Sequence, residues 1–305
     1  MRTFRDFWLL CVGLVFLANL VFAQDHPANG LLVIDAPSTV SAGTDSTVRY
    51  GALGSSDIFF GPHQYLLGLT DIACSPQKPS RIVISDNDYE GNISELLELN
   101  PSGQIIRRTP FGTPGGQLAV AFDRAGNLYA GEDASIFKNG VLFATLPAGS
   151  TMEKMAVDSR GNLYITSLFP VDYLYRVDPK GNVTVFADSS KGLSTPLGLA
   201  IDSMDNIFVA NNPPSAPAFI LRFDPSGNAS PFGSGIAFQP VIRGMTFDPE
   251  DNLYAVLESP YEVLKFDAAG NSSVFADASM RVDLPVAIAI CETKRGDEDR
   301  NHKHD

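Results

Sequence analysis

The stretch Phe122-Asp123-Arg124-Ala125-Gly126-Asn127-Leu128-Tyr129 decides the fold, because close copies of it recur along the chain. The copies span 157–164, 201–208 and 247–254, and their leading aspartates lie 35, 44 and 46 residues apart. A related pattern, Val177-Asp178-Pro179-Lys180-Gly181-Asn182, stands between them, with further copies at 223–228 and 266–271 and a weaker one at 99–104. Repeats of this period that hold several short strands predict a β-propeller.

Each copy carries the side chains of a tight turn between two strands. An aspartate at its start accepts hydrogen bonds from backbone groups two residues on, and a glycine near its end supplies a positive φ. Asp205 and Asp251 replace that glycine in two copies, and aspartate is among the few residues tolerated there. We therefore expect four antiparallel strands per repeat, A to D from the axis outward. Asn139-Gly140 predicts a two-residue hairpin in a shortened second blade.

The inner strand can be followed six times, because it also occurs at 71–74 and 285–290. Six repeats over 24–291 give about 45 residues each, within the usual blade length. The last inner strand has no partners after it, whereas 29–35, 47–50 and 58–60 resemble strands B, C and D. The sequence thus predicts an all-β, six-bladed propeller closed by N-terminal strands that pair with the C-terminal inner strand.

The two ends of the chain lie outside this domain. Residues 1–23 begin with Arg2 and Arg5, continue as an apolar stretch and end in Val21-Phe22-Ala23, which predicts a signal peptide cleaved after Ala23. The alternative is an uncleaved membrane anchor. Residues 292–305 are charged and hold nothing to bury, so we expect a flexible tail. We expect a secreted or periplasmic protein that does not span a membrane after cleavage.

Two cysteines remain beyond the signal, Cys74 and Cys291. They fall on inner strands that are neighbours across the expected closure. In an oxidising compartment such a pair can form a disulfide. The alternative is two buried free thiols.

Composition limits the kinds of partner. The chain has 305 residues, a formal net charge of −13 and 44% hydrophobic residues. An acidic protein lacks the basic face that phosphate contacts require, so no nucleic-acid partner is expected. We expect a monomer whose partner is a protein or a small polar ligand.

The repeated modules resemble those of NHL-repeat and gluconolactonase-like six-bladed propellers, and streptogramin lyases look similar. The resemblance implies a divalent metal at the axis of the lactonases and an essential histidine in the blades of the lyases. The positions of this chain that correspond to the starts of the inner strands are Thr70, Leu118, Glu153, Leu197, Arg243 and Val286. One carboxylate and one arginine do not provide the six to eight oxygens that Ca²⁺ takes.

Glu153, Arg243 and Thr70 are therefore the candidate residues of the channel. Glu153 and Arg243 are interpreted as a structural ion pair or, alternatively, as an anion-binding or acid–base pair. A weaker metal candidate is the run from Asp86 through Asp88 to Glu90, which follows the start of a calcium loop but lacks its closing glutamate. No cofactor is expected apart from calcium at this loop.

The B–C and D–A connections form the rim opposite the repeated turns, and loops on rigid scaffolds carry recognition. Aromatic, amide and acidic side chains there suit sugars or peptides; the alternative is a merely solvated rim. The candidates are Tyr89, Glu132, Asp133, Tyr173, Asn211, Asn212, Glu258 and Tyr261.

The leading hypothesis is an exported, non-catalytic propeller that serves as a binding or scaffolding module. The alternative is a divergent gluconolactonase-like hydrolase of lactones or esters, or a lyase, with its site in the axial channel.

Overall fold

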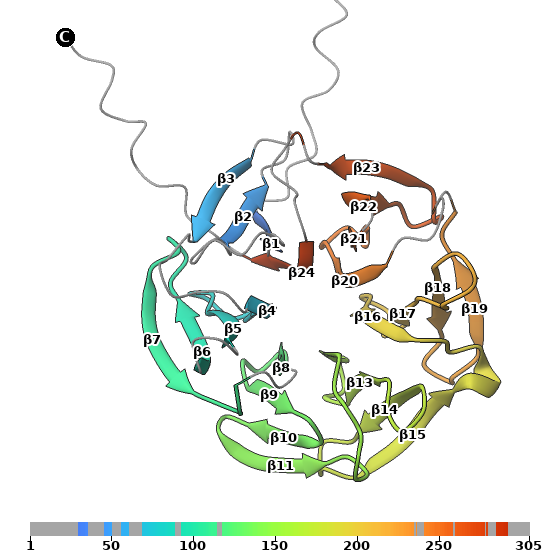
Figure 1. Cartoon of the computed structure of the whole chain (residues 1–305), viewed down its shortest axis with the longest axis horizontal. Helices are drawn as coiled ribbons and strands as arrows, with labels where there is room; N and C mark the ends of the chain where they lie inside the picture. The colour runs from blue at the N-terminus through green and yellow to red at the C-terminus, as the bar shows by residue number, and fades with distance from the viewer. Residues whose placement is uncertain are drawn as a thin grey trace, which may run out of the picture.

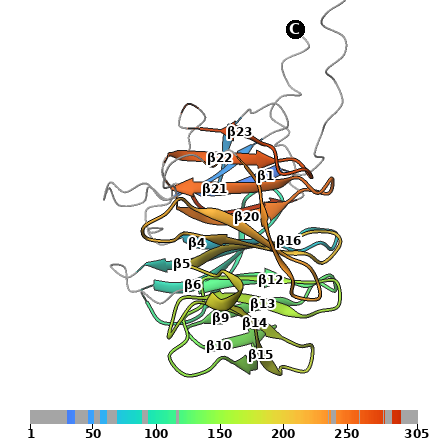
Figure 2. The ribbon, with the colours of Figure 1, turned by 90° about the vertical axis from the view of Figure 1, so that its right-hand side faces the viewer.

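Strands of the described part of the chain form six four-stranded antiparallel sheets around a central axis (Figure 1). The computed structural model describes residues 30–35, 46–50, 56–60, 69–88, 93–114, 118–234, 236, 241–258, 260–277, 279 and 285–291. The predicted signal peptide and tail lie outside these residues. Seen from the side, the strands of neighbouring sheets lie in stacked layers (Figure 2).

Five of the sheets are blades built from consecutive strands. Blade 1 holds β4 (Leu69–Cys74), β5 (Ile82–Asp88), β6 (Ile93–Leu99) and β7 (Ile105–Pro110). Blade 2 holds β8 (Leu118–Phe122), β9 (Leu128–Glu132), β10 (Ser135–Lys138) and β11 (Val141–Thr145). Blade 3 holds β12 (Lys154–Val157), β13 (Leu163–Ser167), β14 (Tyr173–Val177) and β15 (Val183–Asp188), followed by the short helix η1 (Ser189–Lys191).

The last two of these blades follow the same plan. Blade 4 holds β16 (Pro196–Ile201), β17 (Ile207–Asn211), β18 (Phe219–Phe223) and β19 (Ala229–Phe232). Blade 5 holds β20 (Ile242–Phe247), β21 (Leu253–Glu258), β22 (Tyr261–Phe266) and β23 (Ser272–Ala276). In every blade the first strand lies nearest the axis and the fourth lies at the periphery (Figure 1).

The remaining sheet is composite, since it joins both ends of the described chain in the order β24-β1-β2-β3. Its strands are β24 (Pro285–Cys291), β1 (Gly30–Asp35), β2 (Ser46–Tyr50) and β3 (Ser56–Phe60). β1 runs antiparallel to β24, with Gly30 opposite Cys291 and Val33 opposite Ile288. The structure thus has five contiguous blades where the sequence predicted six blades, and the strands assigned to the shared sixth blade form this composite sheet.

A disulfide joins Cys74 of β4 to Cys291 of β24. The two Cα atoms are 5.4 Å apart, and the cysteines are separated by 217 residues in the sequence. The bond therefore links blade 1 directly to the composite sheet.

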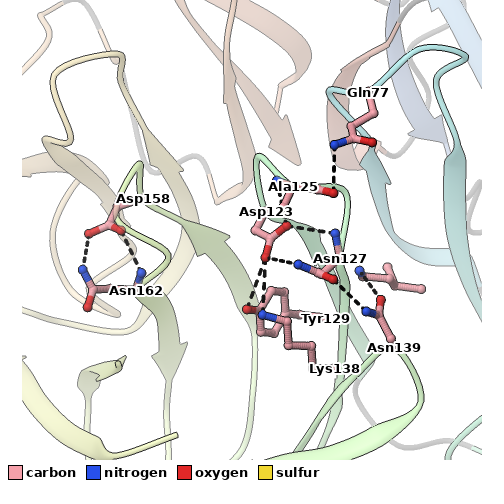
Figure 3. A network of polar contacts seen from close by, with 10 residues as sticks. Gln77, Asp123, Ala125, Asn127, Tyr129, Lys138, Asn139, Asp158 and Asn162 are labelled. Atoms are coloured by element: carbon pink, nitrogen blue, oxygen red, sulfur yellow. Dashed lines mark hydrogen bonds and ion pairs between the residues drawn. The ribbon is translucent and has the colours of Figure 1, made fainter. Parts of the chain in front are cut away.

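The repeated turns have the geometry that their residues predicted. Asp123 Oδ1 accepts hydrogen bonds from the backbone N–H groups of Ala125 (3.0 Å) and Asn127 (2.8 Å), and Oδ2 accepts one from Asn127 Nδ2 (2.7 Å) (Figure 3). Gly126 completes the turn with a φ of 81°. The same three bonds recur in the turns that begin at Asp158, Asp178, Asp202, Asp224, Asp248 and Asp267.

The two aspartates that replace the turn glycine also connect neighbouring blades. Asp205 has a φ of 64°, and its carboxylate accepts hydrogen bonds from the backbone N–H (2.8 Å) and the hydroxyl (2.6 Å) of Ser159 in the preceding blade. Asp251 has a φ of 60° and holds Ser203 in the same way. The side chain thus compensates for a backbone conformation that a glycine would adopt more easily.

Acid should destabilise the protein through these turns. Hydrogen bonds from the asparagine side chain and backbone at the end of each turn lower the pKa of Asp178, Asp224 and Asp267 below the ordinary 3.8. A carboxyl with a lower pKa in the folded state stabilises above its unfolded pKa, and this contribution is lost as the pH falls through the folded pKa. We expect the contribution of these three carboxyls to the free energy of unfolding to be constant from pH 7 to about 5 and to be lost below about 4.

A matched variant isolates the turn contribution. Asn100 forms the weaker copy of the turn, with its Oδ1 accepting from the N–H groups of Ser102 (2.9 Å) and Gln104 (3.0 Å). Asparagine therefore supports the same backbone without titrating, and Asp224→Asn should fold and show a shallower loss of stability in acid. An acid slope that is identical in both proteins would contradict this explanation.

Candidate functional site

The clearest functional candidate is a pocket of about 220 Å³ on the axis, at the end where the inner strands begin. It is lined by Leu69, Thr70, Glu153, Lys154, Leu197, Arg243 and Val286, which come from four blades and the composite sheet. The structure therefore brings together five of the six inner-strand positions singled out from the sequence. The sixth, Leu118, is fully buried, and its carbonyl accepts a hydrogen bond from the Thr70 hydroxyl (3.4 Å).

Lys154 is a lining residue that the sequence reasoning missed. Its Nζ lies 2.7 Å from Asp71 Oδ1 and donates to the carbonyl of Thr70 (3.1 Å). Asp71 Oδ2 accepts from the backbone N–H of Val120 (3.0 Å), so the carboxylate is fully engaged. In a regular strand successive side chains point to opposite faces, so Lys154 would point to the face opposite that of Glu153. The strand begins only at Lys154, however, so alternation does not govern the residue before it.

Glu153 is the carboxylate of the pocket, and its environment favours the protonated form. Burial raises its pKa above the ordinary 4.5, and the charges of Lys154 and Arg243 offset only part of this effect. Desolvation penalises a charge that no partner neutralises. Compared with an exposed glutamate, this carboxyl keeps its proton, and with it the ability to donate a hydrogen bond, to a higher pH.

Arg243 does not form the ion pair with Glu153 that the sequence suggested. Its Nε and one terminal nitrogen both lie 2.6 Å from Oε2 of Glu258. Glu258 ends β21, which pairs with β20 in the same blade, so the partner comes from the neighbouring strand. The sequence placed Glu258 on the rim opposite the repeated turns, and the structure connects it to the axial pocket through Arg243.

Thr70 offers a hydroxyl whose position is held by its own blade. Its Oγ1 is 2.8 Å from the hydroxyl of Ser85, which also donates to the carbonyl of Asp71 (3.3 Å). Ser85 lies on β5 opposite Asp71, so two strands of blade 1 support this corner of the pocket.

Two of the predicted rim residues organise loops around the pocket. Asn211 is fully buried, and its Oδ1 accepts from the backbone N–H of Ser194 (2.7 Å). Asn212 Oδ1 accepts from the N–H of Ile242 (2.7 Å), which ties blade 4 to the start of blade 5. Their amides are thus occupied by backbone groups, and they position the inner strands that carry Leu197 and Arg243.

The other rim candidates are scattered over separate blades. Glu132 accepts hydrogen bonds from the backbone and hydroxyl of Thr113. Asp133 has a φ of 51° in the turn after β9. Tyr173 stacks on Tyr175 with ring centroids 5.1 Å apart, and Tyr261 is exposed. Tyr89 lies outside the described residues, so the rim hypothesis stays a prediction.

The calcium candidate is only partly described. Asp86 and Asp88 belong to the regular strand β5, with Asp86 paired to Glu95, whereas the sequence had placed them in a loop. Glu90 lies outside the described residues. Among the residues that the structure describes, no three His, Cys, Asp or Glu side chains are close enough together to hold a metal ion. Calcium binding at 86–90 remains a prediction.

A wider hollow of about 540 Å³ opens at the turn end of the axis. Its lining includes Ser159, Ser203, Asp205 and Asp251, the residues of the inter-blade hydrogen bonds. These polar groups already hydrogen-bond to one another across neighbouring blades.

Comparison with solved structures finds propellers of several kinds. A protein of unknown function from Bacteroides caccae has a TM-score of 0.61 and 12% identity, covering 86% of this chain and 98% of its own. Virginiamycin B lyase from Staphylococcus aureus has a TM-score of 0.56 and 18% identity, covering 74% and 78%. A gluconolactonase from Xanthomonas campestris has a TM-score of 0.51 and 16% identity, covering 88% and 89%. At such identities the likeness shows the propeller fold alone.

Searches by sequence add no relative: no family model and no curated protein matches the chain. Within the described residues, no helix has the length and apolar character required to cross a membrane.

Proposed function

We propose that this protein is an exported β-propeller that binds a small polar ligand in its axial pocket without catalysing a reaction of that ligand. In this proposal the composite sheet serves as the sixth blade and closes the ring around the pocket. The observation that carries the proposal is the placement of Glu153, Lys154, Arg243 and Thr70 in one axial pocket.

The charges of the pocket favour a neutral ligand. Lys154 is paired with Asp71 and Arg243 with Glu258, so both cations are neutralised before a ligand arrives. Glu153 tends to hold a proton, because burial raises its pKa. An ionic ligand would have to compete with ion pairs that already exist, whereas a hydroxyl can add hydrogen bonds to them.

Size and hydrogen-bonding capacity indicate a polyhydroxylated molecule. The pocket of about 220 Å³ is smaller than the usual range of drug-sized sites, which begins at roughly 300 Å³. Hydroxyls both donate and accept, which matches the carboxyl of Glu153, the remaining guanidinium N–H groups of Arg243 and the Thr70 hydroxyl. A monosaccharide or a short linear polyol combines these properties.

A second candidate is hydrolysis of a lactone or ester, and one observation favours it. A carboxyl whose pKa is raised by burial is the kind of group that general acid–base catalysis uses. Against it, the described pocket pairs Glu153 with no histidine and no hydroxyl nucleophile activated by a base.

One experiment separates the two candidates. The purified full chain is incubated with glucono-δ-lactone, with calcium and with chelator, while its melting temperature and metal content are measured. We expect spontaneous hydrolysis only and no calcium-dependent rise in melting temperature. Catalysed hydrolysis that requires a bound divalent ion would replace the binding proposal with the enzymatic one.

Glu153→Gln should stabilise the protein at neutral pH. Because the pKa of Glu153 is raised in the folded state, ionisation costs stability, and this cost is absent below about 4.5 and grows as the pH rises through the folded pKa. The neutral amide removes that cost, so we expect a higher urea midpoint than the wild type at pH 7 and no difference near pH 4. Urea melts at the two pH values measure it; equal stability at pH 7 would contradict the assigned environment.

A further inference from the structure

A second cavity, of about 310 Å³, lies between blades 1 and 2, away from the axis. On the side of blade 1 it is bounded by Val83 and Thr109, together with Glu98 and its two arginine partners. Phe137 and Ala130 of blade 2 form the opposite wall. The proposal below concerns this cavity alone and does not depend on the axial pocket.

Blades 2 to 5 share an aromatic pair that packs toward the following sheet. A ring on the second strand meets a phenylalanine on the fourth strand, with centroids 4.8–5.6 Å apart and the rings crossed at 75° or more. The pairs are Tyr129–Phe143, Tyr164–Phe186, Phe208–Phe232 and Tyr254–Phe275. The residue opposite the first ring on the third strand is a cation in all four blades: Lys138, Arg176, Arg222 and Lys265.

Blade 1 departs from this pattern at each of the three positions. Val83 occupies the place of the first ring, because it lies opposite Glu98 just as Tyr129 lies opposite Lys138. Thr109 lies opposite Leu96 in blade 1, and Phe232 lies opposite Ile220 at the same register position of blade 4. A threonine therefore stands in blade 1 where blade 4 has the phenylalanine of the pair. The cavity therefore lies where two edge-to-face rings pack in the other blades.

Blade 2 contributes apolar and aromatic side chains to the opposite side of the cavity. Val83 packs in one cluster with Ala130 of blade 2, and Leu128 is packed against the same cluster. Phe137 forms an edge-on pair with Phe111, with centroids 5.5 Å apart. The walls are thus apolar and offer ring edges to a third ring.

The polar side of the cavity carries a net positive charge. Glu98 receives Arg81 at 2.6 Å on one oxygen and pairs with Arg107 through the other. Although burial opposes it, these hydrogen bonds hold the pKa of Glu98 below its ordinary value, so the carboxylate stays ionised. Two guanidinium groups share one carboxylate, and the side chain of Arg107 is 61% exposed. Its unused N–H groups can bind a further anion.

We propose that this cavity binds a small aromatic carboxylate. The ring occupies the vacated place between Val83 and Phe137, and the carboxylate binds the guanidinium of Arg107. The volume of about 310 Å³ falls at the lower end of the range for small-molecule sites. Charge and apolar walls together select an aromatic acid over an aliphatic acid or an aromatic amine.

The test titrates the purified full chain with phenylacetate, and with phenylacetamide, cyclohexylacetate and phenethylamine as matched controls, by calorimetry and ligand-observed NMR. We expect phenylacetate to bind at least ~10-fold more tightly than any control. The double variant Val83→Tyr with Thr109→Phe rebuilds the ring pair of the other blades. It should melt at an equal or higher temperature and lose phenylacetate binding.

A milder variant covers the case in which the double variant does not fold. Arg107→Gln changes an exposed side chain and should abolish the preference for phenylacetate over phenylacetamide. Glu153→Gln, in the separate axial pocket, should leave phenylacetate binding unchanged. The proposal is overturned if phenylacetate does not bind up to ~10 mM. It is also overturned if binding persists in the folded double variant or if Arg107→Gln retains the full preference.

Discussion

Removing the disulfide, as Cys74→Ala together with Cys291→Ala, is expected to lower the free energy of unfolding by about 2–5 kcal/mol. The bond closes a loop of 217 residues, and the entropy lost by the unfolded chain grows with the length of the loop. It also joins β4 to β24, the strand with which β1 pairs. Without the bond, no covalent cross-link holds the composite sheet to blade 1.

Urea unfolding of the double variant and of the reduced and oxidised wild type measures this effect. The reduced wild type should match the double variant, because both lack the cross-link and differ only in two buried side chains. Equal stability of the oxidised protein and the double variant would show that the composite sheet does not depend on the bond.

The second large effect is expected at the buried turns. Asp202 is 8% exposed and accepts hydrogen bonds from the N–H groups of Met204 (2.9 Å) and Asn206 (2.8 Å) and from Asn206 Nδ2 (2.7 Å). Asp202→Ala removes the two oxygens that accept these three hydrogen bonds and leaves the buried amide of Asn206 without its partner. A buried donor that loses its acceptor costs about 1–3 kcal/mol, so the total should reach about 2–4 kcal/mol.

Asp267→Ala is the matched control, because Asp267 makes the same three bonds in an exposed turn. Water can replace those bonds, so the control should lose far less stability than Asp202→Ala. Thermal and urea melts of the two variants give the comparison. Equal losses would mean that burial does not determine what these turns contribute.

The sequence predicted the strands well wherever a turn copy was present. The copy at 122–129 marks the end of β8 and the start of β9 correctly, because the turn residues act locally. The strand pairing of β1 with β24 could also be inferred, from an inner strand that had no partners after it. Local turn chemistry and repetition were sufficient for the propeller of four-stranded blades.

The site was harder to predict, because its contacts join strands that are far apart in sequence. The ion pair of Lys154 with Asp71 spans two blades, and no local pattern signals it. Arg243 forms its ion pair with Glu258 rather than with Glu153, and this pairing depends on the register of β20 with β21. The missing rings at Val83 and Thr109 become visible only when the cross-strand pairs of different blades are compared.

The most direct test of the central claim measures which molecules enter the axial pocket. Saturation-transfer NMR on the full chain compares a set of neutral monosaccharides and linear polyols with the corresponding sugar acids and amino sugars. A parallel series uses Val286→Phe, which fills the pocket with an apolar ring and leaves its charged groups in place. We predict signals from neutral members of the set, weakened by Glu153→Gln and lost in Val286→Phe. Signals only from charged members, or signals unchanged in Val286→Phe, would contradict the account.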